Sequence, residues 1–348
     1  MDPLPPKIVR RLVIAPLGLA LSVLMLAVSP ALILLAAIAD LFLPGSWRTT
    51  RLVTFGAGYV LFEVLGLLAM FGLWIVSGFG LRMKTERMRK LNYAFMTWWL
   101  KCINGLARWL FRLRIWIEDR PVPKPGPILL FPRHAGPGNS LILMGTLMIG
   151  YKRQPRIVML AKLQWEPMFD TMLNRMPNRF IRHDPKRRDV YVDAISELAR
   201  GLGPTDAFVL FPEGKDFTPR VRTRAIEYLR SKGHDTHRER AERMRRVLPP
   251  RHNGVLAAMN AAPEADVVLV AHSILEDLGT FKELWRRIPL DRVVTGRYWR
   301  MPASEVPREK DELIEWLYKW WETIDAWIED RSSLAHAIET AKTESLLD

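Results

Sequence analysis

The longest apolar stretch of the chain constrains its fold more than any other feature. From Leu12 to Ala39 there are 28 consecutive residues without a charge. A second apolar run extends from Leu52 to Leu81 and is interrupted only by Glu63. A helix of about 20 apolar residues is long enough to cross the hydrocarbon core of a bilayer. The sequence therefore predicts a hairpin of two transmembrane helices, with Glu63 near its seam or at an interface.

Basic residues flank these two apolar runs unequally. Three lysines or arginines precede the first run and five follow the second within residues 82–90, whereas the connecting loop carries two. Positive charge concentrates on the cytoplasmic side of membrane proteins. We therefore expect a multi-pass protein of the cell membrane with two spans, in which the chain after about residue 82 faces the cytoplasm.

A basic segment rich in tryptophan follows the hairpin, at residues 83–117. Trp98, Trp99 and Trp109 recur at helical spacing, with Lys101 and Arg108 among them. This pattern is typical of a helix that lies in the headgroup region of a membrane. The alternative is a helix packed on the soluble domain. The same two alternatives apply to the apolar stripe of residues 311–330, where the acidic content favours packing.

The whole chain is strongly basic, with 51 Lys and Arg against 37 Asp and Glu and a formal net charge of +14. This balance indicates a polyanionic partner. The sequence has no helix-turn-helix, zinc-finger, Rossmann or P-loop pattern, so the charge favours membrane lipids and phosphorylated ligands over nucleic acid. Cys102 is the single cysteine, which excludes an intramolecular disulfide and a Cys-based zinc site. We expect no metal.

Beyond residue 118 the chain alternates between apolar strand-like runs and helical periods. The helical pattern is clearest at 189–202, and the strand-like runs are 127–131, 156–161, 206–211 and 266–272. Such alternation predicts an α/β domain with a central mixed sheet flanked by helices. We expect four parts: an N-terminal segment with the hairpin (1–82), the basic interfacial helix (83–117), the α/β domain (118–305), and a C-terminal amphipathic helix and tail (306–348).

Two polar motifs begin where predicted strands end. They are "FPRHAGPGNS" at 131–140 and "FPEGKDFTP" at 211–219, and "RMPNRFIRHD" at 175–184 lies between them. Ligands of such sheets sit beyond the carboxyl ends of the strands. Two strand ends that meet in one crevice would bring His134 close to Glu213.

These three motifs resemble, in order and spacing, those of the glycerolipid acyltransferases, the family that includes lysophosphatidic acid acyltransferase. That family has His, four residues and Asp, then "FI-x-R", then "FPEG". The segments "FPEGKDFT" and "LPPRHNG" (248–254) also resemble the branch that acts on lysophosphatidylglycerol and lysocardiolipin. The resemblance implies the glycerolphosphate acyltransferase-like fold and transfer of a fatty acyl group from acyl-CoA or acyl carrier protein to a lysophospholipid hydroxyl. It implies no cofactor beyond this co-substrate, and as partners it implies membrane phospholipids, a lysophospholipid acceptor and an acyl thioester donor.

The resemblance makes His134 the catalytic base. A neutral imidazole can take the proton of a hydroxyl that attacks a thioester. Its other ring nitrogen needs an acceptor, which is Asp in the family and Asn139 here. An amide accepts a hydrogen bond but cannot stabilise an imidazolium. Three possibilities follow. Asn139 accepts the hydrogen bond from the His134 ring, or Asp184 or Asp216 accepts it instead, or the protein is a catalytically weak or inactive lipid-binding relative.

The remaining candidate residues are expected to bind the acceptor lipid. The resemblance assigns phosphate binding to Arg182, assisted by Arg179 and His183, because a guanidinium can bind two phosphate oxygens. Glu213 would bond glycerol hydroxyls, and Gly214 lets the backbone approach a ligand closely. Lys215, where the family has Thr or Ser, would add a phosphate contact.

Two further expectations concern the "HAGPGNS" loop. The backbone N–H groups of Gly136–Gly138 are one candidate source of donors for the thioester oxyanion. Ser140 with His134 offers an alternative reading as a hydrolase, although the chain has no "GxSxG" motif.

Overall fold

The computed structural model describes residues 4–118, 124–134, 136–182, 188–273, 281–291 and 293–344. The chain divides into two compact units. The hairpin unit comprises Met1–Arg114, Leu141–Arg188 and Phe281–Arg292, and the sheet unit comprises Ile115–Ser140, Asp189–Thr280 and Val293–Asp348. Each unit is therefore assembled from distant segments, and the four parts expected from the sequence cut across this division.

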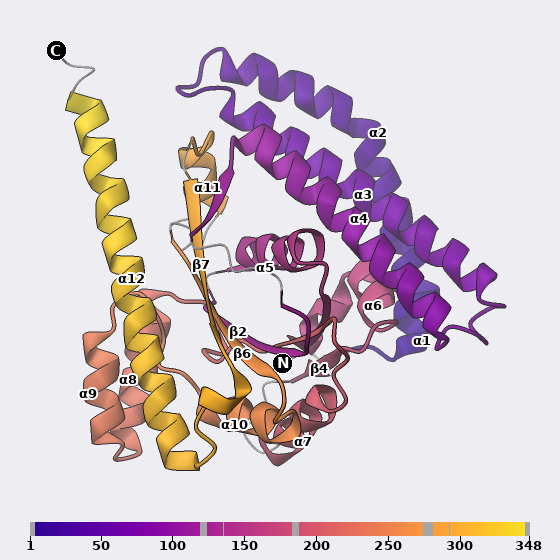
Figure 1. Cartoon of the computed structure of the whole chain (residues 1–348). Coiled ribbons are helices and arrows are strands. Elements are labelled where there is room, and N and C mark those ends of the chain that lie inside the picture. The colour runs from indigo at the N-terminus through magenta and orange to yellow at the C-terminus, as the bar shows by residue number, and fades with distance from the viewer. Residues whose placement is uncertain are drawn as a thin grey trace. The chain divides into compact units, whose positions relative to one another are not determined.

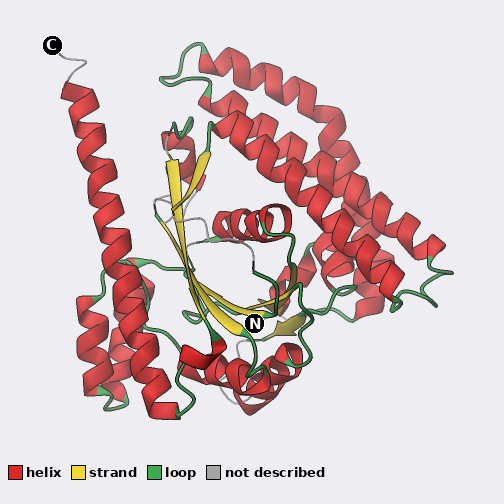
Figure 2. Cartoon of the chain, in the orientation of Figure 1, coloured by secondary structure: helices red, strands yellow, loops and turns green. Residues whose placement is uncertain are grey.

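The hairpin unit is mainly helical (Figures 1 and 2). Its helices are α1 (Lys7–Val9), α2 (Ala15–Asp40), α3 (Arg48–Val76), α4 (Glu86–Phe111), α6 (Pro167–Leu173) and α11 (Phe281–Arg287), and short π or 3-10 turns occupy Arg10–Ile14, Thr146–Gly150 and Ala161–Trp165. The strands β3 (Gln154–Leu160) and β4 (Arg179–Ile181) pair in parallel, with Val158 opposite Arg179 and Leu160 opposite Ile181.

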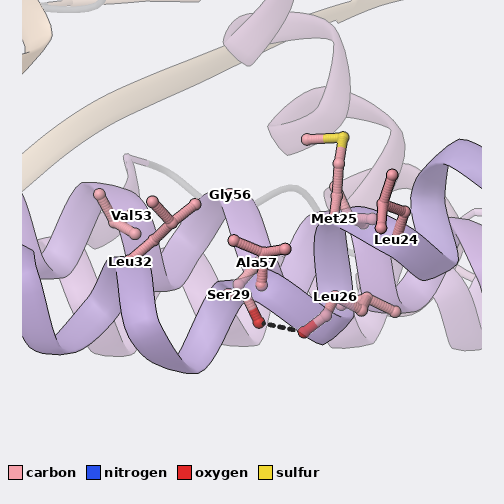
Figure 3. Close-up of a pocket in the computed structure, with 10 residues that line it drawn as sticks. Leu24, Met25, Leu26, Ser29, Leu32, Val53, Gly56 and Ala57 are labelled. Atoms are coloured by element: carbon pink, nitrogen blue, oxygen red, sulfur yellow. Dashed lines mark hydrogen bonds between the residues drawn. The ribbon is translucent and has the colours of Figure 1, made fainter.

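Helices α2 and α3 form the predicted hairpin and lie side by side. The continuous helices Lys7–Asp40 and Arg48–Val76 are both long and apolar enough to cross a membrane. The most apolar window of the first helix is only 6% buried, against 22% for the second. An apolar groove between them is lined by residues that include Leu24, Leu32 and Val53 (Figure 3). Its one hydroxyl, on Ser29, donates to the Leu26 carbonyl at 2.8 Å. The groove therefore offers a hydrocarbon-like surface.

Helix α3 contacts later parts of the hairpin unit near both of its ends. At its start, the Thr49 hydroxyl accepts a 3.2 Å hydrogen bond from the Trp285 indole. Near its end, the Met70 carbonyl accepts a 2.8 Å hydrogen bond from Arg175. Glu63, between these points, is buried rather than turned outward. The helix is therefore held along much of its length by segments that follow the hairpin in sequence.

A buried cluster of charged side chains attaches the N-terminal end of the hairpin to helix α6. Asp170 in α6 is 2% exposed and pairs with Arg10 at 2.8 Å and with Arg11 at 3.0 Å. Gln164 also accepts a 3.0 Å hydrogen bond from Arg10. Buried charges of this kind persist only when they are paired.

Helix α4 is the tryptophan-rich segment, and it is amphipathic. It begins at the cap residue Thr85, whose hydroxyl accepts from the Met88 N–H. Trp99 is 1% exposed inside the unit, whereas Trp98 and Trp109 are 42% and 72% exposed. One face of α4 thus packs in the unit, as the packing alternative predicted, and the other presents aromatic side chains outward.

The sheet unit holds a mixed sheet, which confirms the predicted fold class. Its strands lie in the order β1-β7-β6-β2-β5. Strand β2 pairs in parallel with both β5 and β6, and β7 is antiparallel to β6. Every residue of β2 and β5 is buried, as expected of continuous apolar strands covered on both faces. The strand bounds are β1 (Arg114–Glu118), β2 (Ile128–Pro132), β5 (Asp206–Val209), β6 (Asp266–His272) and β7 (Val293–Met301).

Helices flank this sheet. They are α7 (Arg188–Ala199), α8 (Pro219–Ser231), α9 (Asp235–Arg243), α10 (His252–Ala261) and α12 (Lys310–Glu344), with a 3-10 turn at Ala303–Glu305, and the unit boundary divides α5 (Pro137–Gly145). Helix α12 contacts both α10 and β6. Leu317, Trp321 and Ile324 of α12 are fully buried. The packing prediction for this C-terminal helix is confirmed.

Candidate active site

Two loops of the sheet unit meet beyond the carboxyl ends of β2 and β5. The strands are parallel neighbours, with Leu130 opposite Val209, so their next residues emerge at the same edge. The backbone N–H of Phe217 donates to the His134 carbonyl at 3.0 Å and joins the loops. The prediction that these two strand ends lie together is confirmed.

His134 lies at the centre of this junction. Its Nδ1 atom is 3.0 Å from Oδ1 of Asp216, and its side chain is 22% exposed. The Phe211 ring lies beside the imidazole, with ring centroids 4.3 Å apart. The same Asp216 oxygen accepts a 2.8 Å hydrogen bond from the Gly136 N–H. One carboxylate oxygen therefore lies within ion-pair distance of the imidazole and also accepts a hydrogen bond from the backbone of the loop that carries it.

Asn139 makes a different contact from the one expected at its position. Its side-chain amide is buried and donates to the Arg133 carbonyl at 3.0 Å. The carboxylate at His134 Nδ1 belongs to Asp216, one of the two substitutes named from the sequence. The other, Asp184, lies outside the described residues, as does His183.

Glu213 is buried beneath the two loops. It is 2% exposed, Oε1 accepts from the His134 backbone N–H at 3.0 Å, and Oε2 accepts from the Leu248 N–H at 2.9 Å. Both carboxylate oxygens thus hold protein backbone. These contacts favour a positioning role for Glu213 over the predicted contact with glycerol hydroxyls.

Burial shifts the pKa values of both titratable groups. Desolvation lowers the pKa of His134; the Asp216 charge opposes this shift and the Arg133 charge reinforces it. Desolvation raises the pKa of Glu213 to about 7, although the Arg133 charge and the two backbone N–H donors oppose the rise. A lowered imidazole pKa keeps His134 neutral, which is the form that can accept a proton.

Arg133 carries a positive charge that lowers the pKa values of both His134 and Glu213. Its side chain is fully buried, and Nη2 donates to the Arg246 carbonyl at 2.6 Å. The backbone N–H of Arg133 donates to the Val270 carbonyl at 2.9 Å, which fixes the end of β2 beside β6. In the sequence, the place of Arg133 directly before His134 in "FPRHAG" is the signal that could have indicated this role.

The turn after Glu213 needs its glycine. Gly214 has a φ of +67°, and a Cβ there would lie 3.4 Å from the Arg251 guanidinium. The Arg251 N–H donates to the Pro212 carbonyl at 2.9 Å, which joins "LPPRHNG" to the "FPEG" turn. Lys215, the next residue, is exposed. The close approach at Gly214 therefore involves a protein side chain. Arg251 is a further residue of this region, and its place in "LPPRHNG" is the signal that could have indicated it.

A carboxylate of α12 holds the backbone just before Leu248. Asp325 accepts backbone hydrogen bonds from Arg245, Arg246 and Val247 at 3.0, 2.5 and 3.1 Å. The next N–H along the chain is that of Leu248, which donates to Glu213. Asp325 thus holds the backbone of residues 245–247, and Glu213 links the next residue, Leu248, to the backbone of His134.

Two of the predicted phosphate ligands, Arg179 and Arg182, belong to the hairpin unit, and the third, Lys215, belongs to the sheet unit. Arg179 lies in β4 and is partly buried, and Arg182 is exposed just after the strand. Arg179, Arg182 and Lys215 therefore remain predictions as substrate-binding residues.

Gly136 bears on the predicted source of oxyanion donors. Its N–H donates to Asp216, so it is directed at the protein. The Gly138 N–H remains a candidate donor. Across the described ranges, no group of three His, Cys, Asp or Glu side chains has the arrangement of a metal site.

Comparison with known proteins bears on this arrangement. Residues 114–275 match the family model described as Acyltransferase. No curated protein matches the chain. Among solved structures, the chain is similar to the 1-acyl-sn-glycerophosphate (LPA) acyltransferase PlsC from Thermotoga maritima, with 14% identity, a TM-score of 0.44, and coverage of 78% of this chain and 96% of that one. The matched residues include both loops that meet at His134, and the match indicates an acyltransferase domain at residues 114–275.

Proposed function

We propose that this acyltransferase moves a fatty acyl group from an acyl thioester to a hydroxyl of a lysophospholipid, with His134 as general base. One observation carries the proposal. A partly exposed imidazole lies at the carboxyl end of β2, its Nδ1 is 3.0 Å from a carboxylate, and its pKa is lowered by burial. These are the properties that a base needs to deprotonate a hydroxyl near neutral pH.

The reaction needs no covalent enzyme intermediate. The lipid hydroxyl transfers its proton to Nε2 of His134 as its oxygen attacks the thioester carbonyl carbon. The new C–O ester bond forms, the C–S bond breaks, and the imidazolium returns the proton to the thiolate that leaves. The donor is acyl-CoA or acyl carrier protein, and the acceptor is a lysophospholipid such as lysophosphatidic acid.

The two alternatives make different demands on the site. An inactive lipid-binding relative would follow if the ring nitrogen had lost its carboxylate, and Asp216 argues against that loss. A hydrolase would use Ser140 as nucleophile with His134 as its base. No GxSxG motif surrounds Ser140, so acyl transfer is the better supported reading.

A substrate panel tests the proposal. Purified protein would be given radiolabelled acyl-CoA or acyl carrier protein with lysophosphatidic acid, lysophosphatidylglycerol, lysocardiolipin or no acceptor. We expect a labelled phospholipid product with at least one acceptor. Binding of lysophospholipid without transfer to any acceptor would contradict catalysis. Release of free fatty acid in the absence of acceptor, abolished by Ser140→Ala, would support the hydrolase instead.

We further propose that the hairpin enters one leaflet of the membrane from the cytoplasmic side, instead of crossing it twice. Residues 49 and 70 of α3 are about 32 Å apart along the axis at 1.5 Å per residue, which is about the thickness of the hydrocarbon core. Their partners, Trp285 and Arg175, both follow the hairpin in sequence. Two spans would put these partners on opposite sides of the bilayer. The exposed apolar surface of α2 and the outward Trp98 and Trp109 fit a helix pair that lies in the membrane surface.

Thiol labelling separates the two topologies. In a Cys102→Ser background, Ser46→Cys places a thiol in the exposed turn between α2 and α3, and Ser231→Cys places one on the exposed end of α8. A membrane-impermeant maleimide would be added to sealed right-side-out and inside-out vesicles. We expect both cysteines to react only in inside-out vesicles. Labelling of Ser46→Cys from the outer side alone would support two spans.

A further inference from the structure

The carboxylate beside the His134 ring lies on a different loop from the one that the family motif indicates. The motif expects the carboxylate five residues after the histidine, on the same loop. Here that position is Asn139, and the carboxylate 3.0 Å from His134 Nδ1 belongs to Asp216 on the loop after β5. The two loops are joined by the 3.0 Å hydrogen bond from the Phe217 N–H to the His134 carbonyl.

Asn139 and Asp216 have roles that depend on their chemistry. Asn139 donates a hydrogen bond from its amide to the Arg133 carbonyl, and a carboxylate could not donate this bond. Asp216 accepts the Gly136 N–H with the oxygen that faces the ring, and an amide could present an N–H to that donor. Each side chain therefore fits its own position and not the other.

We propose that Asp216 is the positioning residue of the His134 base, and that Asn139 serves only to brace the loop. This inference rests on the proposed function. Asp216 would accept the N–H of Nδ1, which leaves Nε2 free to take the proton of the acceptor hydroxyl. It would then stabilise the imidazolium until the proton passes to the thiolate of the donor.

The surroundings of the ring make this carboxylate important. Arg133 is fully buried next to the imidazole and disfavours its charged form, as does burial itself. Glu213 holds the backbone N–H of His134, and its own pKa is raised to about 7 by burial. His272, which is buried, adds a further imidazole nearby whose pKa is also lowered by burial. Among these groups, Asp216 is the one whose charge favours protonation of His134.

Three substitutions test the inference, with acyl transfer as the first readout. Asp216→Asn should lower kcat by at least about 10²-fold, given that an equivalent change in a serine protease costs about 10⁴-fold. Its KM for the acceptor and its thermal unfolding should stay close to those of the wild type. Asp216→Glu should retain more activity, and Asp235→Asn, at an exposed carboxylate on α9, is the control that should change nothing. An Asp216→Asn variant within twofold of wild-type kcat would overturn the proposal.

Asn139→Asp gives the opposite test. It removes the donor to the Arg133 carbonyl and leaves Asp216 beside the ring, so it should not raise kcat. A rise in kcat would show that position 139, not Asp216, limits the base.

A second readout does not depend on activity. The rate at which diethyl pyrocarbonate modifies His134, measured by mass spectrometry across pH 5–8, reports the pKa of the imidazole. Asp216→Asn should lower this pKa, because the carboxylate favours the charged form. Identical pKa values in the two proteins would overturn the role of Asp216. Failure of the wild type to transfer acyl groups would count against the proposed function alone, since the labelling result would still decide the contact.

Discussion

Glu213 accepts a 3.0 Å hydrogen bond from the backbone N–H of His134. Its other carboxylate oxygen accepts the Leu248 N–H, so a single buried side chain holds two loops. We therefore expect Glu213→Gln to lower kcat while KM for the acceptor stays within about twofold. The glutamine amide can accept only one of the two bonds, and an unpaired buried N–H costs about 1–3 kcal/mol. Steady-state kinetics with Glu227→Gln, at an exposed position of α8, as control would check this; a raised KM with unchanged kcat would instead support a contact with acceptor hydroxyls.

The raised pKa of Glu213 predicts a pH-dependent stability. Its pKa is about 7 in the folded protein against an ordinary value of 4.5. Between these values the folded state keeps a proton that the unfolded state has lost, so the free energy of unfolding falls as pH rises from 4.5 to 7, by at most about 3 kcal/mol from this group. Glu213→Gln lacks this pH-dependent contribution to the free energy of unfolding, because glutamine does not titrate. Chemical unfolding at several pH values should show the wild type losing stability relative to the variant over that range; a constant difference would contradict the shift.

Asp325 on α12 should affect catalysis from outside the loops. Its carboxylate accepts three backbone N–H groups of residues 245–247, and these precede the Leu248 N–H held by Glu213. Asp325→Asn should therefore cost about 1–3 kcal/mol of stability and lower kcat severalfold. Glu315→Gln removes an exposed carboxylate of the same helix that pairs with Arg240, and it should leave kcat unchanged. Equal kcat values for Asp325→Asn and Glu315→Gln would show that α12 does not influence the active site.

Gly214 and Gly233 form a matched pair for a test of backbone conformation. Their φ angles are +67° and +70°, but Gly214 follows Glu213 whereas Gly233 lies in open space between α8 and α9. Alanine at either position should cost about 1 kcal/mol, because L-residues disfavour this conformation. Only Gly214→Ala should lower kcat. Equal losses of activity in the two variants, measured at matched folded fractions, would mean that the turn itself does not position the site.

Several features could be predicted from the sequence because they depend on local patterns. The short apolar runs predicted β2, β5 and β6, and the motifs that follow β2 and β5 could be expected at one edge because parallel strands end together. The acidic, aromatic stripe of residues 311–330 correctly indicated a packed helix.

Other features depend on side-chain direction or on distant segments. Whether Asn139 or Asp216 faces His134 is decided by the course of two loops that are 77 residues apart, and no spacing rule contains that information. The motif "FPEG" likewise does not indicate that the Glu213 side chain points towards backbone N–H groups and not towards solvent. The apolar runs predict membrane contact, but the partners of α3 at Thr49 and Met70 come from residues 285 and 175, which sequence periodicity cannot connect.

The most direct test of the central claim is the initial rate of acyl transfer from radiolabelled acyl-CoA to lysophosphatidic acid by the wild type and by His134→Ala, with Ser140→Ala alongside. The product would be counted after separation of the lipids, and thermal unfolding would confirm that each variant is folded. We predict transfer by the wild type, a loss of about 10²–10⁴-fold for His134→Ala, and little change for Ser140→Ala. Undiminished transfer by folded His134→Ala protein would contradict the account.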